Sequence, residues 1–159
     1  MAIQVGDRIP SVTLKHISES GPQEISTDEV FGGKKVVMFS VPGAFTPTCS
    51  ARHLPGFVDR AQEFRDKGYE VVCTAVNDPF VMKAWGEQAG VAGKVRMLPD
   101  GNGTFVKAMG LDFDASAFHL GTRGQRFALV AEDGVVKQIW VEKPGTFEVS
   151  SAEAVLANL

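Results

Sequence analysis

Hydrophobic and polar positions divide the chain into alternating strand-like and helix-like segments. Two runs, Lys34–Val41 and Tyr69–Val76, are mostly apolar and rich in valine, which is typical of strands buried on both faces. Between them, apolar residues recur at helical spacing from Leu54 to Phe64 and predict an amphipathic helix. The other predicted elements are β pieces within 3–26, a helical turn at 28–31, a helix after Asp78, a strand at 95–98, a helix at 105–109, strands at 126–131 and 135–141, and a final helix ending at Leu159.

The order of these elements is β-α-β-α-β-α followed by β-β-α. This order predicts an α/β protein with a thioredoxin-like fold, in which helices flank a central mixed β-sheet, with an N-terminal β extension. The chain has 159 residues and contains no repeat, low-complexity tract or linker. We therefore expect a single thioredoxin-like domain over residues 1–159.

Local signals predict how several elements begin, bend and end. Ser150 with Glu153 predicts a capping box for the final helix. Asp133-Gly134 predicts a hairpin turn, whereas residues 111–124 are expected to form a loop. Pro55 lacks a backbone N–H, so we expect it to kink the helix in which it lies.

Composition excludes several functional classes. A net charge of −3 without a Lys/Arg block gives no electrostatic footprint for nucleic acid or an anionic membrane. No stretch approaches the roughly 18 apolar residues of a membrane span, and the opening MAIQVGDRIP lacks the pattern of a secretory signal. Two cysteines are too few for a disulfide framework. We therefore expect a cytoplasmic protein with no nucleic-acid or membrane partner.

Cys49 stands where a predicted buried strand gives way to a predicted helix. Thr46 followed by Pro47 is typical of an N-cap and a first helical residue, which makes Cys49 the third residue of the helix. Free N–H groups and the helix dipole favour negative charge there, so a thiol ionises more easily and its thiolate is the nucleophile. The alternative is a cysteine packed as a small apolar side chain. The helix start and the polar flanking residues favour the reactive role.

Other residues near this cysteine allow two interpretations. The Thr46 hydroxyl either faces the same cavity as the thiol or only caps the helix. Pro42 either shields the thiolate from water or simply ends the strand. His53 follows the cysteine by four residues, which invites a Cys–His pair or a metal site. No Asn or Asp is identifiable to orient its ring, and His16 and His119 lack ligand spacing, so a histidine that packs in the fold is favoured.

The pattern Pro42-x-x-x-Thr46-x-x-Cys49 resembles the active-site motif of the peroxiredoxins. The runs VPGAFTPTCSARHLPGF at 41–57, VNDPFVMKAW at 76–85 and GTRGQRFALV at 121–130 are similar to the Prx5 (type II) subfamily. The resemblance covers essentially the whole chain. It implies a thiol peroxidase that uses no metal, haem or flavin and that reduces hydrogen peroxide and alkyl hydroperoxides.

The resemblance also implies roles for individual residues. Cys49 would be the peroxidatic cysteine, whose thiolate attacks the distal oxygen of a peroxide and becomes a sulfenic acid. Thr46 would hydrogen-bond the peroxide and the sulfur, within the motif that Pro42 begins. Arg126 would stabilise the thiolate and the charge that develops on oxygen, together with backbone N–H groups. Arg123 is a weaker candidate for orienting a neighbouring group.

A second thiol must resolve the sulfenic acid. Cys73 lies in the middle of an apolar strand and is expected to be an inert buried cysteine, although a Cys49–Cys73 disulfide stays open at this stage. The resemblance places the resolving cysteine of some subfamily members at Ser150, which has no thiol. An external thiol is therefore expected, with glutathione or glutaredoxin favoured over thioredoxin.

Subfamily members form compact homodimers, and the resemblance implies a dimer contact that includes some of Phe45, Phe80 and Leu120. Two other functions compete with a peroxidase. A thiol–disulfide oxidoreductase is disfavoured because such enzymes normally use Cys-x-x-Cys, and residues 50–52 contain no cysteine. A redox-sensing or relay protein, in which oxidised Cys49 signals to a partner, is compatible with peroxidase activity.

Overall fold

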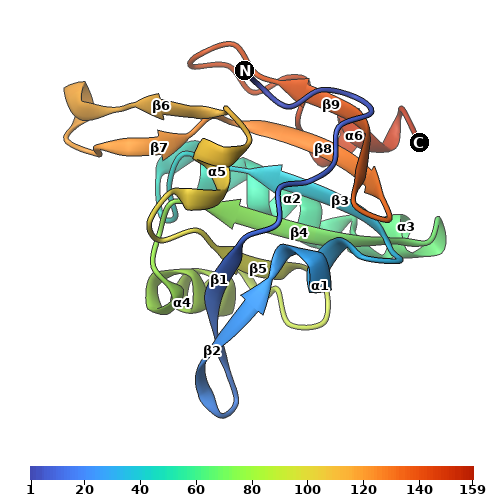
Figure 1. The fold of residues 1–159 in the computed structure, drawn as a ribbon, viewed down its shortest axis with the longest axis horizontal. Coiled ribbons are helices and arrows are strands. Elements are labelled where there is room, and N and C mark those ends of the chain that lie inside the picture. The colour runs from blue at the N-terminus through green and yellow to red at the C-terminus, as the bar shows by residue number, and fades with distance from the viewer.

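The computed structural model describes all 159 residues and has a five-stranded sheet at its centre. The strand order is β5-β4-β3-β8-β9; β3, β4 and β5 run parallel, and β8 and β9 are antiparallel to their neighbours (Figure 1). These strands are β3 (Lys35–Ser40), β4 (Tyr69–Ala75), β5 (Arg96–Pro99), β8 (Phe127–Glu132) and β9 (Val135–Val141). The predicted α/β class with a central mixed sheet is confirmed.

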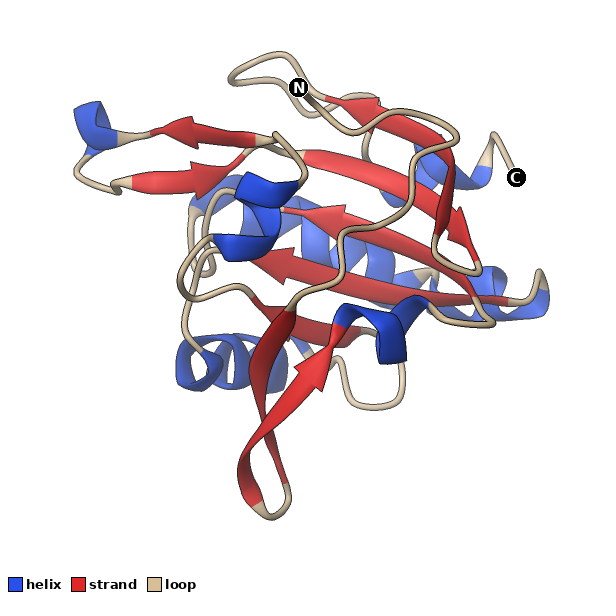
Figure 2. Cartoon of the chain, viewed as in Figure 1, coloured by secondary structure: helices blue, strands red, loops and turns tan.

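Helices cover both faces of this sheet (Figure 2). Side chains from α2, α3, α4 and α6 pack in one core, and side chains from α1 and α5 pack in the other together with the N-terminal segment. The helices are α1 (Thr27–Phe31), the π-helical η1 (Cys49–His53), α2 (Leu54–Asp59), α3 (Ala61–Asp66), α4 (Pro79–Ala89), α5 (Thr104–Ala108), the 3-10 turn η2 (Ser116–Phe118) and α6 (Ala152–Leu156). No helix is long and apolar enough to cross a membrane.

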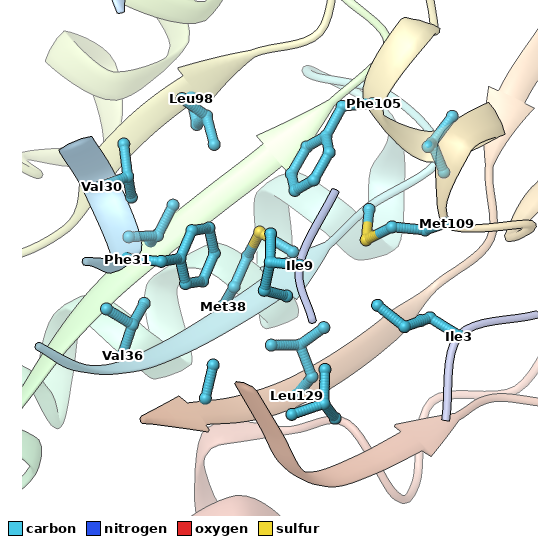
Figure 3. Packing of buried hydrophobic residues seen from close by; sticks show 14 of the residues in the cluster. Ile3, Ile9, Val30, Phe31, Val36, Met38, Leu98, Phe105, Met109 and Leu129 are labelled. Atoms are coloured by element: carbon cyan, nitrogen blue, oxygen red, sulfur yellow. The ribbon is translucent and has the colours of Figure 1, made fainter. Parts of the chain in front are cut away.

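The central strand β3 is apolar from Val36 to Phe39 because its side chains point alternately into the two cores. Val36 and Met38 point into the core that Figure 3 shows, whereas Val37 and Phe39 belong to the opposite core that also holds Cys49. All five residues from Val36 to Ser40 are buried. Each large apolar side chain buried in this way contributes about 1.5–3 kcal/mol relative to an exposed one.

Two hairpins lie outside the central sheet. The N-terminal extension is the hairpin of β1 (Thr13–Ser18) and β2 (Gly21–Ser26), as predicted. A second hairpin, β6 (Asp112–Asp114) and β7 (Thr122–Gly124), replaces the loop expected over residues 111–124, so that prediction was wrong. Its strands have only three residues each, which is too short for a periodic pattern to be visible in the sequence.

The predicted hairpin turn at Asp133-Gly134 is confirmed, whereas the predicted capping box of the last helix is not. Asp133 and Gly134 join β8 to β9 with φ values of 47° and 76°, as the Asp-Gly signal predicts. The capping box at Ser150 and Glu153 was wrong by one residue: Ser151 caps α6 by accepting a hydrogen bond from the backbone N–H of Ala154. Ser150 instead forms hydrogen bonds with His53 and Glu142 in the candidate active site described below.

Candidate active site

The cysteine lies in the first turns of a helix that follows β3. The helix begins at Pro47, directly after Thr46, as predicted. From Cys49 to His53 it takes the wider π form, in which the N–H of Leu54 donates to the carbonyl of Cys49. Pro55 comes next and has no N–H to continue an α-helical ladder, so the expected kink takes the form of this π turn.

Strand pairing brings Arg126 to the cysteine. β8 runs antiparallel to β3, with Ser40 opposite Phe127, so the start of β8 lies beside the end of β3. Arg126 immediately precedes β8, and its Nη2 donates a hydrogen bond of 3.2 Å to the sulfur of Cys49. Cys49 is fully buried. A guanidinium hydrogen-bonded to a buried sulfur stabilises a thiolate there, because it pairs the negative charge and solvates it in place of water.

His53 holds this arginine from the other side. Its Nδ1 lies 2.8 Å from Nη1 of Arg126, and its Nε2 lies 2.9 Å from the carbonyl oxygen of Ser150. Arginine can only donate, so Nδ1 accepts and Nε2 carries the proton that goes to the carbonyl. His53 is therefore a neutral imidazole with one tautomer fixed by its partners. Burial, and secondly the charge of Arg126, lower the pKa of His53 to about 3.

The interpretation of His53 as a histidine that only packs in the fold was incomplete. Its ring does contact aromatic side chains, with centroids 4.8 Å from both Phe39 and Phe147. However, it also bonds the arginine that bonds Cys49, so it orients the site. The sequence contained a signal for this role, because a buried histidine needs partners for both ring nitrogens. Those partners are Arg126 and a backbone carbonyl rather than the Asn or Asp that was sought.

Glu142, which follows β9, fixes the loop that supplies this carbonyl. Its carboxylate accepts hydrogen bonds from the backbone N–H groups of Glu148, Val149 and Ser150 and from the hydroxyls of Thr146 and Ser150, at 2.7–3.0 Å. Burial acts to raise the pKa of Glu142, but the hydrogen bonds from these donors lower it overall. The Glu142 N–H also donates to the Arg126 carbonyl at 2.9 Å. Glu142 thus ties the loop to the arginine, a role that the sequence did not indicate.

Thr46, Pro42 and Arg123 form the other side of the site. Thr46 stands at the predicted N-cap position, where its carbonyl accepts a hydrogen bond from the N–H of Ser50 at 2.9 Å. Its hydroxyl donates to the carbonyl of Gly43 at 2.7 Å and does not cap a helical N–H, so the alternative of a side-chain cap was wrong. It makes no hydrogen bond to the sulfur. Arg123, on β7, donates to the carbonyl of Pro42 at 3.3 Å and to that of Leu120 at 2.9 Å. This arginine therefore braces the strand exit, in agreement with the weaker expectation that it orients a neighbouring group.

Cys73 sits inside the sheet rather than at its edge. It pairs with Phe39 on β3 and Met97 on β5, and it is fully buried. Burial, and secondly the neighbouring Cys49, raise the pKa of the Cys73 thiol well above its usual value. Both cysteines are free thiols. A thiol that resists ionisation in the middle of a strand is a poor nucleophile, which supports the interpretation of an inert cysteine.

A cavity of about 780 Å³ opens beside the arginine. Pro42, Thr48 and Arg126 line it. Cys49 is not among the lining residues, but its sulfur accepts a hydrogen bond from the guanidinium of Arg126, which is. The remaining lining residues are Arg52, Phe113, Ala115, Phe118, Leu120, Gln125, Glu142, Lys143, Pro144, Gly145, Thr146 and Phe147. No group of three or more His, Cys, Asp or Glu side chains is arranged to hold a metal ion.

The buried His53 predicts how stability depends on pH. Unfolded histidine binds a proton below pH 6.5, whereas native His53 does so only near pH 3, so stability falls as the pH drops through this window. Between pH 7 and pH 5 the loss is about 2 kcal/mol. Urea unfolding at both pH values should show this loss. In His53→Leu the midpoint is expected to be lower at pH 7 but to change less with pH.

The control for this prediction is His16→Gln, at a partly exposed position on β1. This variant should keep the pH dependence of the wild type. If His53→Leu lost as much stability as the wild type between pH 7 and pH 5, His53 would not be the neutral, proton-excluding group that the geometry indicates.

A buried cysteine that accepts a hydrogen bond from arginine, in the helix after the central strand of a helix-flanked mixed sheet, is the arrangement expected of a thiol-based redox protein. Comparison with known proteins narrows this class. The family model described as Redoxin matches residues 4–156. Peroxiredoxin-2B of Arabidopsis thaliana is 45% identical over 159 residues, with 99% of this chain and 98% of the relative covered.

Solved structures agree with this family. Reduced Prx3 of Vibrio vulnificus in complex with H2O2 is 46% identical, with a TM-score of 0.94 and 98% of each chain covered. Peroxiredoxin 5 of Alvinella pompejana is 35% identical, with a TM-score of 0.85 and coverage of 98% of this chain and 96% of that one. The chain belongs to the peroxiredoxins, and within them to the Prx5 (type II) subfamily. The thioredoxin-like fold is thereby confirmed, and the relatives support a thiol peroxidase activity.

Proposed function

We propose that the protein reduces hydrogen peroxide and alkyl hydroperoxides with Cys49 as the peroxidatic cysteine. The observation that carries this proposal is the 3.2 Å hydrogen bond from Arg126 to the Cys49 sulfur. The thiolate attacks the distal peroxide oxygen, the O–O bond breaks, and the other oxygen leaves as water or an alcohol after taking a proton. Cys49 becomes a sulfenic acid. Arg126 stabilises the thiolate before the attack and the leaving oxygen during it.

Thr46 and Pro42 shape the space in which the peroxide reacts. The only proton of the Thr46 hydroxyl goes to the Gly43 carbonyl, so its oxygen is left to accept a hydrogen bond from the peroxide O–H. In this role the Thr46 hydroxyl accepts from the peroxide, whereas the family resemblance implied that it also bonds the Cys49 sulfur. Pro42 lines the cavity with its carbonyl held by Arg123, and it limits the access of water to the thiolate.

We propose that an external thiol completes the cycle. It attacks the sulfenic acid, water leaves, and a second thiol releases Cys49 from the mixed disulfide. The buried Cys73, whose pKa is raised, supports an external rather than an internal resolver, as does the serine at position 150. As this external thiol we propose glutathione with glutaredoxin ahead of thioredoxin.

Two measurements test how the sulfenic acid is resolved. Peroxide turnover with glutathione plus glutaredoxin should exceed turnover with thioredoxin plus its reductase. Mass analysis under non-reducing conditions, after one equivalent of peroxide, should show the gain of one oxygen atom. Dimedone added to the same sample should react with the sulfenic sulfur, release the oxygen as water and leave a thioether adduct on Cys49. The loss of two hydrogens, with Cys49 linked to Cys73, would contradict the external cycle.

We further propose that residues 1–159 act as one domain and pair as a homodimer in a reducing compartment such as the cytoplasm. The two cores share a single sheet, which supports one domain. Phe45 and Phe80 are 50% and 66% exposed, and apolar side chains of this size at the surface favour burial against a second copy. The two free thiols are compatible with a reducing compartment.

A further inference from the structure

We propose that the cavity beside Cys49 selects hydroperoxides in which an apolar chain carries a carboxylate, as in the hydroperoxides of fatty acids. This inference rests on the proposed peroxidase function and adds to it a preference for substrate charge. It arises from the lining of the cavity, because its surface is mostly apolar and three of the four charged side chains that line it are cationic.

The size of the cavity shows that hydrogen peroxide alone does not account for it. Its volume of about 780 Å³ lies within the usual range of roughly 300–1,000 Å³ for sites that bind small organic molecules. A water molecule, close in size to hydrogen peroxide, occupies about 30 Å³ of liquid. The cavity therefore has room for a long substituent on the peroxide oxygen.

Two loops supply the apolar walls. The β6–β7 hairpin contributes Phe113, Phe118 and Leu120, and the loop after β9 contributes Pro144 and Phe147. These side chains offer aromatic and aliphatic surface without hydrogen-bonding groups, so they suit an alkyl chain. Phe118 is 75% exposed, and burying it against a substrate chain would remove this apolar surface from water.

The charged residues of the cavity are three cations and one carboxylate. The carboxylate, Glu142, is already bonded to the loop that follows it. Arg126 is already bonded to the Cys49 sulfur and to His53. Arg52 and Lys143 remain. Neither makes a salt bridge, and the Arg52 guanidinium lies 4.8 Å from the centre of the Phe147 ring.

The lining of the cavity suggests where each part of such a substrate binds. The hydroperoxide group must reach the sulfur that accepts a hydrogen bond from Arg126, so its carbon chain lies along the phenylalanine walls. A carboxylate on that chain then shares the cavity with Arg52 and Lys143, the two lining cations that form no ion pair. Both side chains are exposed, so each interaction is screened and is expected to change the rate only about two- to fivefold.

The test compares linoleic acid hydroperoxide with its methyl ester, which have the same chain and the same peroxide but differ in charge. Both are assayed as monomers in solution, with tert-butyl hydroperoxide as a neutral reference. For the wild type, kcat/KM should be about three- to tenfold higher for the acid than for the ester at low salt, and this ratio should shrink at high salt. In the double variant Arg52→Gln, Lys143→Gln the ratio should fall to about one.

The matched control is Lys137→Gln, which removes a cation at an exposed position on β9 outside the cavity. This variant should keep the preference for the acid. A wild-type ratio near one, or a ratio that the double variant leaves unchanged, would overturn the inference. tert-Butyl hydroperoxide distinguishes failure of this inference from failure of the proposed function. If the wild type does not reduce it, the proposed peroxidase function itself is overturned.

Discussion

Cys49→Ser is expected to lower peroxide consumption about a thousandfold or more, to the level of the uncatalysed reaction between peroxide and the added thiol. A serine hydroxyl is not ionised at neutral pH and cannot form a sulfenic acid. Arg126 would then face an uncharged oxygen in place of a thiolate. The assay is peroxide loss in the presence of a small external thiol, with the wild type and the variant at equal concentration.

Cys73→Ser is the matched variant for this experiment. Both cysteines are fully buried and belong to the same core, so both substitutions place a hydroxyl in a similar environment. Cys73→Ser should keep most of the peroxidase turnover, even if it lowers the free energy of unfolding. Circular dichroism of both variants checks that they fold. Turnover that persists in folded Cys49→Ser would refute the role of this cysteine.

The sheet could be predicted from the sequence because burial on both faces leaves uninterrupted apolar runs. β3 alternates its side chains between two cores, so polar residues have no place in it. The order of strands and helices followed from the same patterns. The short β6–β7 hairpin could not be predicted, since Phe113 is the only large apolar side chain in its two strands and the pairing depends on contacts across the turn.

In the candidate site too, local features could be predicted from the sequence, whereas contacts between distant residues could not. Cys49 stood out from local features, namely a strand end, Thr46-Pro47 and a helix start. Arg126 was identified only through the resemblance, because its hydrogen bond to the sulfur joins residues 77 positions apart. The bond from His53 to Ser150 spans 97 positions. No periodicity encodes such pairs, and the fold determines them through the antiparallel pairing of β3 with β8 and through the loop that Glu142 holds.

Ser150 has a structural role in the site that needs no thiol. Its carbonyl accepts a hydrogen bond from His53, and its N–H and hydroxyl donate to Glu142. The loop that carries Ser150 thereby helps to fix Arg126 through His53. A loop held by so many hydrogen bonds would resist the movement that an internal disulfide requires, which agrees with the proposed external thiol.

Arg126→Met is expected to lower kcat/KM for peroxide about 100- to 1,000-fold, the usual loss when a donor aimed at developing charge is removed. Methionine is similar in length and can fill the buried space, but it offers no N–H to Cys49 or to His53. Arg126→Lys should recover only part of the activity, because a single ammonium cannot reproduce the planar fork that spans the sulfur and the imidazole.

One further readout, the alkylation of Cys49, distinguishes a direct role of Arg126 from a merely structural one. The rate of Cys49 alkylation at one fixed pH should fall in Arg126→Met, since the sulfur loses its positively charged donor. Arg96→Met, at an exposed position on β5, serves as the control and should leave both the alkylation rate and the peroxidase rate unchanged. If Arg126→Met folded normally and matched the wild type in both assays, the hydrogen bond to Cys49 would be a packing contact without catalytic consequence.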